Sequence, residues 1–272
     1  GIESLLTTKN IKTQKVTWET TFTFTKNVNK LESIYNQDQV SDIGNKLILG
    51  APLNPNYNYV YDGVWQESEA AAAASYGMAP GQARPKDLNG DGKFNTDDRT
   101  VIGNPNPEWQ GSLYSKLTVG QFDFNFSVIT SQGQTVLSTF HQNFADVSDR
   151  GRQKLAMDYF IPTNGAGIEA NANTTNPRPG PVATGAGAYW TSLFGYYRDA
   201  SYVKIKNISL GYTLDSELLK KLKISNFRIY VNVLDPFVFT DFDGYDPEWA
   251  ASPFGVNRPA AVTTQLGLSV KF

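Results

Sequence analysis

The sequence predicts an all-β chain whose antiparallel strands form part of a transmembrane β-barrel with long external loops. Three observations predict this class: segments with alternating apolar and polar residues, short connections that alternate with long ones, and a final amphipathic strand that ends on an aromatic residue. The composition agrees, because 13% of the 272 residues are aromatic and only 18% are charged. This balance suits β structure that faces water on one side only.

The composition also excludes several classes of function. The chain has no Cys, so thiolate metal sites, disulfides and cysteine nucleophiles are excluded. Its net charge is −2 and its Lys and Arg residues are scattered, so nucleic acid is not an expected partner. No apolar run approaches the roughly 20 residues of a membrane helix, so a membrane would be crossed by strands. The abrupt start at Gly1 predicts a fragment whose N-terminal part is missing.

The alternation is clearest from Val16, where Trp18, Phe22 and Phe24 share one parity and Thr and Glu residues occupy the other. The same pattern recurs over 121–131, 224–239 and the terminal strand 262–272. Outer-membrane barrels resemble one another in closing on such a strand with a terminal aromatic, here Phe272. An ordinary sheet edge is the alternative interpretation of this ending.

The connections give the predicted sheet two different ends. With Phe272 in the periplasm, short periplasmic turns are expected at 26–29, 119–121 and 215–223, and long external loops at 36–108, 132–199 and 240–261. About seven strands result, over 12–25, 28–35, 109–118, 121–131, 200–213, 224–239 and 262–272. Within 200–213 the apolar parity switches, which predicts a bulge near Lys206 and Asn207.

Several segments, in order, resemble the C-terminal part of SusC-like TonB-dependent outer-membrane transporters. They are Asp-Leu-Asn-Gly-Asp-Gly-Lys-Phe (87–94), Ile-Gly-Asn-Pro (102–105), Ser-Tyr-Val-Lys-Ile-Lys-Asn-Ile-Ser-Leu-Gly-Tyr (201–212), Gly-Tyr-Asp-Pro-Glu (244–248) and the terminal strand. The resemblance implies that residues 1–272 are the C-terminal portion of a plugged barrel of about 22 strands, with the plug domain absent from this chain.

The resemblance further implies a place in the cell outer membrane, in contact with its lipid, and a SusD-like lipoprotein as partner. It implies TonB as the energy source, reached through the missing N-terminal region, and a dimer of transporter-lipoprotein pairs. The implied function is active import of a bulky nutrient, a glycan fragment or a peptide, without enzymatic activity. The alternative is a calcium-stabilised adhesin or carbohydrate-binding β-sandwich.

The chemical motif in the predicted loop 36–108 is an EF-hand-like segment at 87–98. Its spacing predicts a structural Ca²⁺ site because oxygen donors recur at loop positions 1, 3, 5, 7, 9 and 12, with Gly92 permitting the sharp turn. Position 12 departs from the usual Glu and offers a shorter side chain. A solvated turn without an ion is the alternative interpretation. The predicted ligands are Asp87, Asn89, Asp91, the Lys93 carbonyl, Asn95 and Asp98.

No catalytic residue is predicted. His141 is the only histidine, so Ser-His-Asp or His-ligated metal chemistry would have to use it, and its setting is typical of the start of an external loop. An outer-membrane barrel enzyme is a third hypothesis that lacks an evident nucleophile and base.

Overall fold

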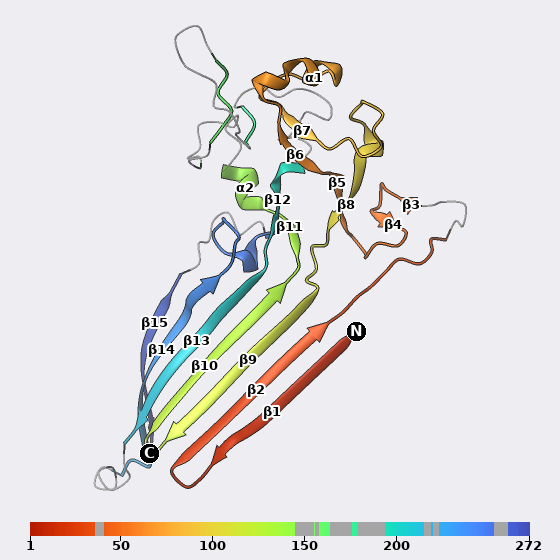
Figure 1. Cartoon of the computed structure of the whole chain (residues 1–272). Coiled ribbons are helices and arrows are strands. Elements are labelled where there is room, and N and C mark those ends of the chain that lie inside the picture. Colours follow the sequence, from red (N-terminus) through yellow and green to blue (C-terminus); the bar gives the residue numbers. More distant parts are fainter. Residues whose placement is uncertain are drawn as a thin grey trace.

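The computed structural model describes residues 1–35, 41–144, 155, 158–163, 176–178, 194–214, 219, 223–252 and 261–272. A seven-stranded antiparallel sheet dominates it, in the order β1-β2-β9-β10-β13-β14-β15 (Figure 1). Each strand pairs antiparallel with its neighbour, and the register shifts only in β1 and within the pairs that β13 makes with β10 and β14. The strands are β1 (Ile2–Lys12), β2 (Val16–Lys26), β9 (Trp109–Val119), β10 (Phe122–Gln132), β13 (Tyr202–Thr213), β14 (Asn226–Phe239) and β15 (Thr263–Lys271).

Six of the seven predicted strands are confirmed, but the strand predicted at 28–35 and the turn predicted at 26–29 are wrong. The first strand is β1, and the tight turn lies at 13–15, where the Thr13 N–H donates to the Val16 carbonyl at 2.8 Å. The alternation of β1 is weak, because Leu5 and Leu6 point to opposite faces and the register skips Asn10. Residues 27–35 instead leave the sheet, and Leu31 bonds to Ala51.

Apart from the turn at 26–29, the predicted separation of short and long connections to opposite ends of the sheet is confirmed for the described residues. The connections at 13–15 and 120–121 lie at one end of the sheet, called here the turn end, and the C-terminus lies there too (Figure 1). The connections over 27–108, 133–201 and 240–262 lie at the opposite end, the loop end. Most of the turn predicted at 215–223 falls outside the described residues.

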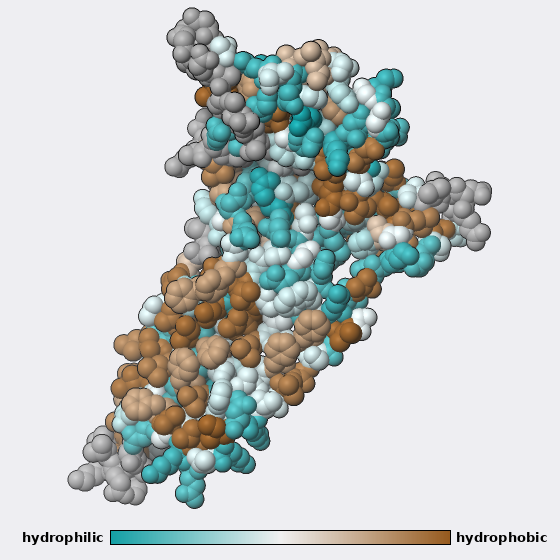
Figure 2. All heavy atoms as spheres, viewed as in Figure 1, coloured by the Kyte–Doolittle hydropathy of each residue, from teal (hydrophilic) through white to brown (hydrophobic). Residues whose placement is uncertain are grey.

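The two faces of the sheet differ in chemistry. One face, called the apolar face, carries Phe22, Phe126, Leu210 and their row partners, and many of these side chains are exposed, as Leu266 is to 80%. Figure 2 shows hydrophobic side chains gathered over the large sheet and hydrophilic ones over the loop end. The opposite, polar face carries Thr, Ser, Asn and charged residues. Such a broad exposed apolar surface is unsuited to water and suits lipid.

The predicted bulge in β13 is confirmed. The register of β10 with β13 passes from Asn207 to Ile205 and skips Lys206, and the pairing of β13 with β14 shifts at the same place. The extra residue keeps Ile205 and Ile208 on the apolar face, which explains the parity switch in the sequence. The other sheets in the described part of the chain are two-stranded pairs, which lie at the loop end of the large sheet (Figure 1).

Small elements cluster at the loop end. Residues 56–103 contain two strand pairs, one short α-helix and the segment 87–98. The helix α2 and the strand pair β11-β12 lie nearer the sheet (Figure 1). No helix among the described residues is long and apolar enough to cross a membrane. The elements are β3 (Ser41–Asp42), β4 (Leu47–Ile48), β5 (Asn56–Tyr59), β6 (Tyr61–Val64), η1 (Glu67–Glu69), α1 (Ala70–Ser75), β7 (Ala83–Pro85), η2 (Thr96–Asp98), β8 (Arg99–Gly103), β11 (Thr135–Leu137), α2 (Thr139–Phe144), η4 (Phe194–Tyr196), β12 (Tyr197–Asp199) and η5 (Pro247–Trp249).

Candidate functional site

The segment 87–98 folds as a compact turn in which backbone N–H groups point at carboxylates. The Gly90 and Gly92 N–H groups donate to the two Asp87 oxygens at 2.6 and 3.0 Å, and the Tyr76 hydroxyl donates to Asp87 Oδ2 at 3.0 Å. Gly90 and Gly92 both have positive φ, at 73° and 76°, which the turn requires. Burial alone would raise the pKa of Asp87, but the donated hydrogen bonds outweigh it and lower the pKa.

The predicted ligand side chains converge only in part. The amide nitrogens of Asn89 and Asn95 lie 3.3 and 3.4 Å from Asp91 Oδ2, so loop positions 3, 5 and 9 face one another. The Asp98 side chain is fully buried, and its two oxygens accept from the Leu88 and Asn95 N–H groups at 2.9 and 3.0 Å. Because Asp is shorter than Glu, position 12 here closes the turn against the backbone.

The chemistry of the donors fits a hard cation, since carboxylate and amide oxygens dominate and each carboxylate oxygen has more than one lone pair. However, no group of three or more His, Cys, Asp or Glu side chains is placed to hold a metal ion in the described ranges. The Ca²⁺ site therefore stays a prediction. The loop is held in place by Tyr76, whose ring stacks on Phe94 with centroids 4.5 Å apart.

His141 lies in an arrangement that contains the residue types of a catalytic triad. Its Nδ1 is 2.7 Å from Ser138 Oγ, and its Nε2 is 2.9 Å from Asp243 Oδ1. Ser138 and His141 are both fully buried, and Ser138 Oγ also accepts from the His141 N–H at the start of α2. The buried Ser138 hydroxyl has no access to a substrate. The cluster of Ser138, His141 and Asp243 therefore joins α2 to the loop that carries Asp243.

Burial, and secondarily the charge of Arg198, lower the pKa of His141, while Asp243 opposes the shift. The imidazole is therefore neutral near pH 7. Around it, Phe140 packs on Tyr245 with centroids 4.7 Å apart, and Thr139 donates to the Ser252 carbonyl at 2.8 Å. These contacts fasten the loop after β14 to α2.

A buried ion cluster, absent from the sequence predictions, joins two of the segments that carry the family resemblance. Lys204 on β13 is 2% exposed, and its Nζ lies 2.8 Å from Asp246 Oδ2 and 2.9 Å from Glu248 Oε2. Lys206, in the bulge, is 2.9 Å from Asp235 and 3.2 Å from Glu248. The segments 201–212 and 244–248 are thus clamped together, and the loop 240–252 is held against the loop end of the polar face.

The polar face carries a second interaction of charged groups. Arg228 donates to both oxygens of Asp123, at 2.9 and 2.6 Å, and its guanidinium lies over the Tyr230 ring at 4.7 Å. The guanidinium crosses Gly211, where any Cβ would collide with it, and Tyr230 likewise lies over Gly267. Glycine at these two positions therefore lets long side chains lie along the wall of the sheet.

The chain is similar to known proteins over most or all of its length. The chain is 31% identical over 261 residues to TonB-dependent receptor P3 of Formosa agariphila, and the alignment covers 91% of this chain and 25% of that protein. It is 27% identical over 285 residues to TonB-dependent receptor SusC of Bacteroides thetaiotaomicron, covering 100% of this chain and 26% of that protein. No family model matches the chain.

The fold has solved counterparts. The structure of the RagAB peptide transporter superposes with a TM-score of 0.72 at 16% identity, covering 99% of this chain and 29% of that one. The RagAB peptide importer in the "open-open" state gives 0.68. The sheet is accordingly part of an outer-membrane barrel. The chain belongs to the SusC-like TonB-dependent receptors, of whose length it spans about a quarter.

Proposed function

We propose that the complete protein imports a bulky polar nutrient across the outer membrane, driven through TonB. The observation that supports this most is the sided sheet, with an uncovered apolar face and long loops at one end, in a chain that matches TonB-dependent receptors over its full length. The relatives are named as receptors and transporters, and the triad-like residues Ser138 and His141 are fully buried. Transport therefore explains the architecture better than catalysis.

The proposed substrate class is a glycan fragment or a peptide. One structural neighbour is described as a peptide transporter, and its TM-score of 0.72 supports a shared barrel. The polar face offers amides, hydroxyls and the Arg228–Asp123 pair, which suit a polar oligomer. Growth of a deletion strain on defined glycans or peptides as sole nutrient, with and without the restored gene, would test the substrate class.

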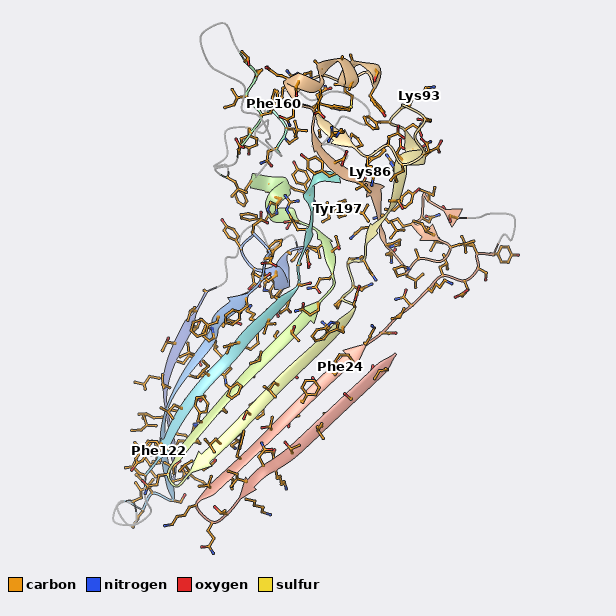
Figure 3. The ribbon with its side chains drawn as sticks, in the orientation of Figure 1. Phe24, Lys86, Lys93, Phe122, Phe160 and Tyr197 are labelled. Atoms are coloured by element: carbon orange, nitrogen blue, oxygen red, sulfur yellow. The ribbon has the colours of Figure 1, made fainter. Side chains whose placement is uncertain are left out.

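We propose a SusD-like lipoprotein as the partner at the loop end and a dimer of such pairs as the assembly. The described external elements, with α1, α2 and the segment 87–98, form a surface at the loop end (Figure 3). Affinity purification of the full-length protein from its native membrane should recover a lipoprotein at equimolar ratio. Recovery of the transporter alone under mild detergent would contradict the partnership.

Membrane fractionation is the first experiment for the proposed function. The full-length product should appear in the outer membrane and migrate faster on a gel before heating than after it. A soluble, calcium-dependent monomer would overturn the transporter and favour an adhesin.

We also propose that the segment 87–98 binds Ca²⁺ as a structural ion. Asp87, Asn89, Asp91, Asn95 and the Lys93 carbonyl would supply the oxygens, with Asp98 buried behind them. External loops meet calcium at millimolar levels, which suits the weak affinity of extracellular modules, roughly 10⁻⁴–10⁻³ M. Bound Ca²⁺ would rigidify the turn without taking part in transport chemistry.

A further inference from the structure

A concave patch, called here the apolar groove, interrupts the apolar face near its loop end. It has a volume of about 590 Å³ and is lined almost entirely by apolar atoms of β2, β9 and β10. Its floor is Gly111, which the register places opposite Phe24 on one side and Thr130 on the other. Phe24, labelled in Figure 3, stacks on Trp109 with ring centroids 5.8 Å apart, and both residues line the groove. The missing side chain at Gly111 thus creates the groove.

A second groove, more polar than the first, is lined by residues close to the first lining in the sequence. It has a volume of about 400 Å³ and is lined by Lys26, Asn27, Lys30, Asn104 and Glu108, among others. The linings of the two grooves adjoin in the sequence, because Lys26 follows Phe24 by two residues on β2 and Glu108 directly precedes Trp109.

Lys26 is the cation best placed to bind a ligand that enters both grooves. It has the parity of Phe22 and Phe24, so β2 directs it to the apolar face. No ion pair involves it within the described ranges, whereas Lys30 lies 3.4 Å from Glu32. An ammonium at the rim of an apolar groove attracts a phosphate through charge and hydrogen bonding.

We propose that the two grooves form one binding site for an outer-membrane lipid, with an acyl chain in the apolar groove and a phosphate-bearing headgroup at Lys26. The volume of the apolar groove falls within the roughly 300–1,000 Å³ of small-molecule sites, and its lining is mostly apolar with few polar groups, as in such sites. The proposal rests on the membrane location of the sheet and is independent of the nutrient that is imported.

The test is photolabelling of the full-length protein in nanodiscs of uncharged lipid. The probes are a phosphatidylglycerol with a diazirine in its acyl chain and an uncharged diacylglycerol with the same chain. The phosphate probe should label residues 22–26 and 109–113 about fivefold more than the apolar face of β14 and β15, and more than the uncharged probe does. Uniform labelling without headgroup preference would overturn the proposal, as would crosslinks showing that a second copy covers the groove.

Variants separate the two parts of the site. Lys26→Gln should lower labelling about fivefold, while Lys271→Gln at the turn end should leave it unchanged. Gly111→Val should fill the groove and abolish the preferential labelling of the groove by the phosphate probe. If that variant loses heat-modifiable migration and so does not fold, Val203→Phe, which places a ring at the rim of the groove, serves as the second blocking variant. Inorganic phosphate should not compete with the probe, and full competition would show a free-anion site and refute the lipid site. Labelling does not depend on nutrient uptake, so failure of the proposed transport function and failure of the lipid site can be told apart.

Discussion

Replacing Lys204 should release the loop 240–252 from the sheet. Lys204→Met removes the only ammonium within 3 Å of Asp246 in the described structure, and Asp246 is 4% exposed. An uncompensated charge of this kind costs about 3–5 kcal/mol. The matched control is Lys206→Met, whose side chain is 33% exposed and whose partners are 28–29% exposed, so its loss should cost about 0–1 kcal/mol. The two variants remove the same charge and differ in burial.

Hydrogen exchange in detergent would measure the difference. The backbone amides of Thr139, Trp249 and Ala250 are hydrogen-bonded within or onto this loop and report its opening. Each 1.4 kcal/mol is a tenfold change, so Lys204→Met should speed their exchange more than about a hundredfold and Lys206→Met less than about tenfold.

A compensating variant tests the cause. Adding Asp246→Asn and Glu248→Gln to Lys204→Met removes the two carboxylate charges that have lost their buried lysine. In the native protein the backbone N–H of residue 248 donates to Asp246 Oδ1 at 3.0 Å, and the amide oxygen of Asn at position 246 can still accept this bond. Most of the protection should return. Equal exchange in Lys204→Met and Lys206→Met, or no recovery on neutralisation, would refute the reasoning that buried charge fastens the loop.

Three further outcomes are expected. Calorimetric titration of the full-length protein with Ca²⁺ should show binding in roughly the 10⁻⁴–10⁻³ M range; Asp91→Ala should abolish it and Lys93→Ala, which keeps the carbonyl, should not. Because the pKa of His141 is lowered from 6.5 in the folded protein, the unfolded chain takes up the proton first as the pH falls, and stability should decline below pH 6.5. In thermal melts, His141→Phe should flatten this dependence of stability on pH. An unchanged slope would contradict the argument that His141 is buried in its neutral form. Gly211→Val should displace Arg228 from Asp123 and cost about 1–3 kcal/mol in urea unfolding, whereas an unaltered midpoint would show that the guanidinium simply moves.

Most of the sheet could be predicted because each strand carries its own signal. β2, β10, β14 and β15 alternate because one face of the sheet is apolar and the other is polar, and the bulge at Lys206 follows from a break in that alternation. The first strand could not be found this way. Its bulge at Asn10 and the adjacent Leu5 and Leu6 blur the period, so the tight turn was placed at the wrong end of β2.

The candidate sites likewise divide into one that depends on neighbouring residues and one that depends on contacts between distant segments. The segment 87–98 is local, with every donor inside twelve consecutive positions, so its turn and its glycines could be predicted from spacing. The clamp between Lys204 and the pair Asp246 and Glu248 spans more than forty residues. Neither lysine nor carboxylate has a pattern that reveals its partner, although both lie in segments that carry the family resemblance.

The sequence by itself determined which residues form the strands after the first, which end of the sheet has the long loops, and the family to which the chain belongs, because these properties depend on neighbouring residues and on ordered motifs. The tertiary structure alone decided the pairing of β1, the burial of His141 and Lys204 beneath the loop 240–252, and the groove over Gly111. Those features arise where distant strands and loops meet, and contacts between distant segments leave no periodic trace in a single sequence.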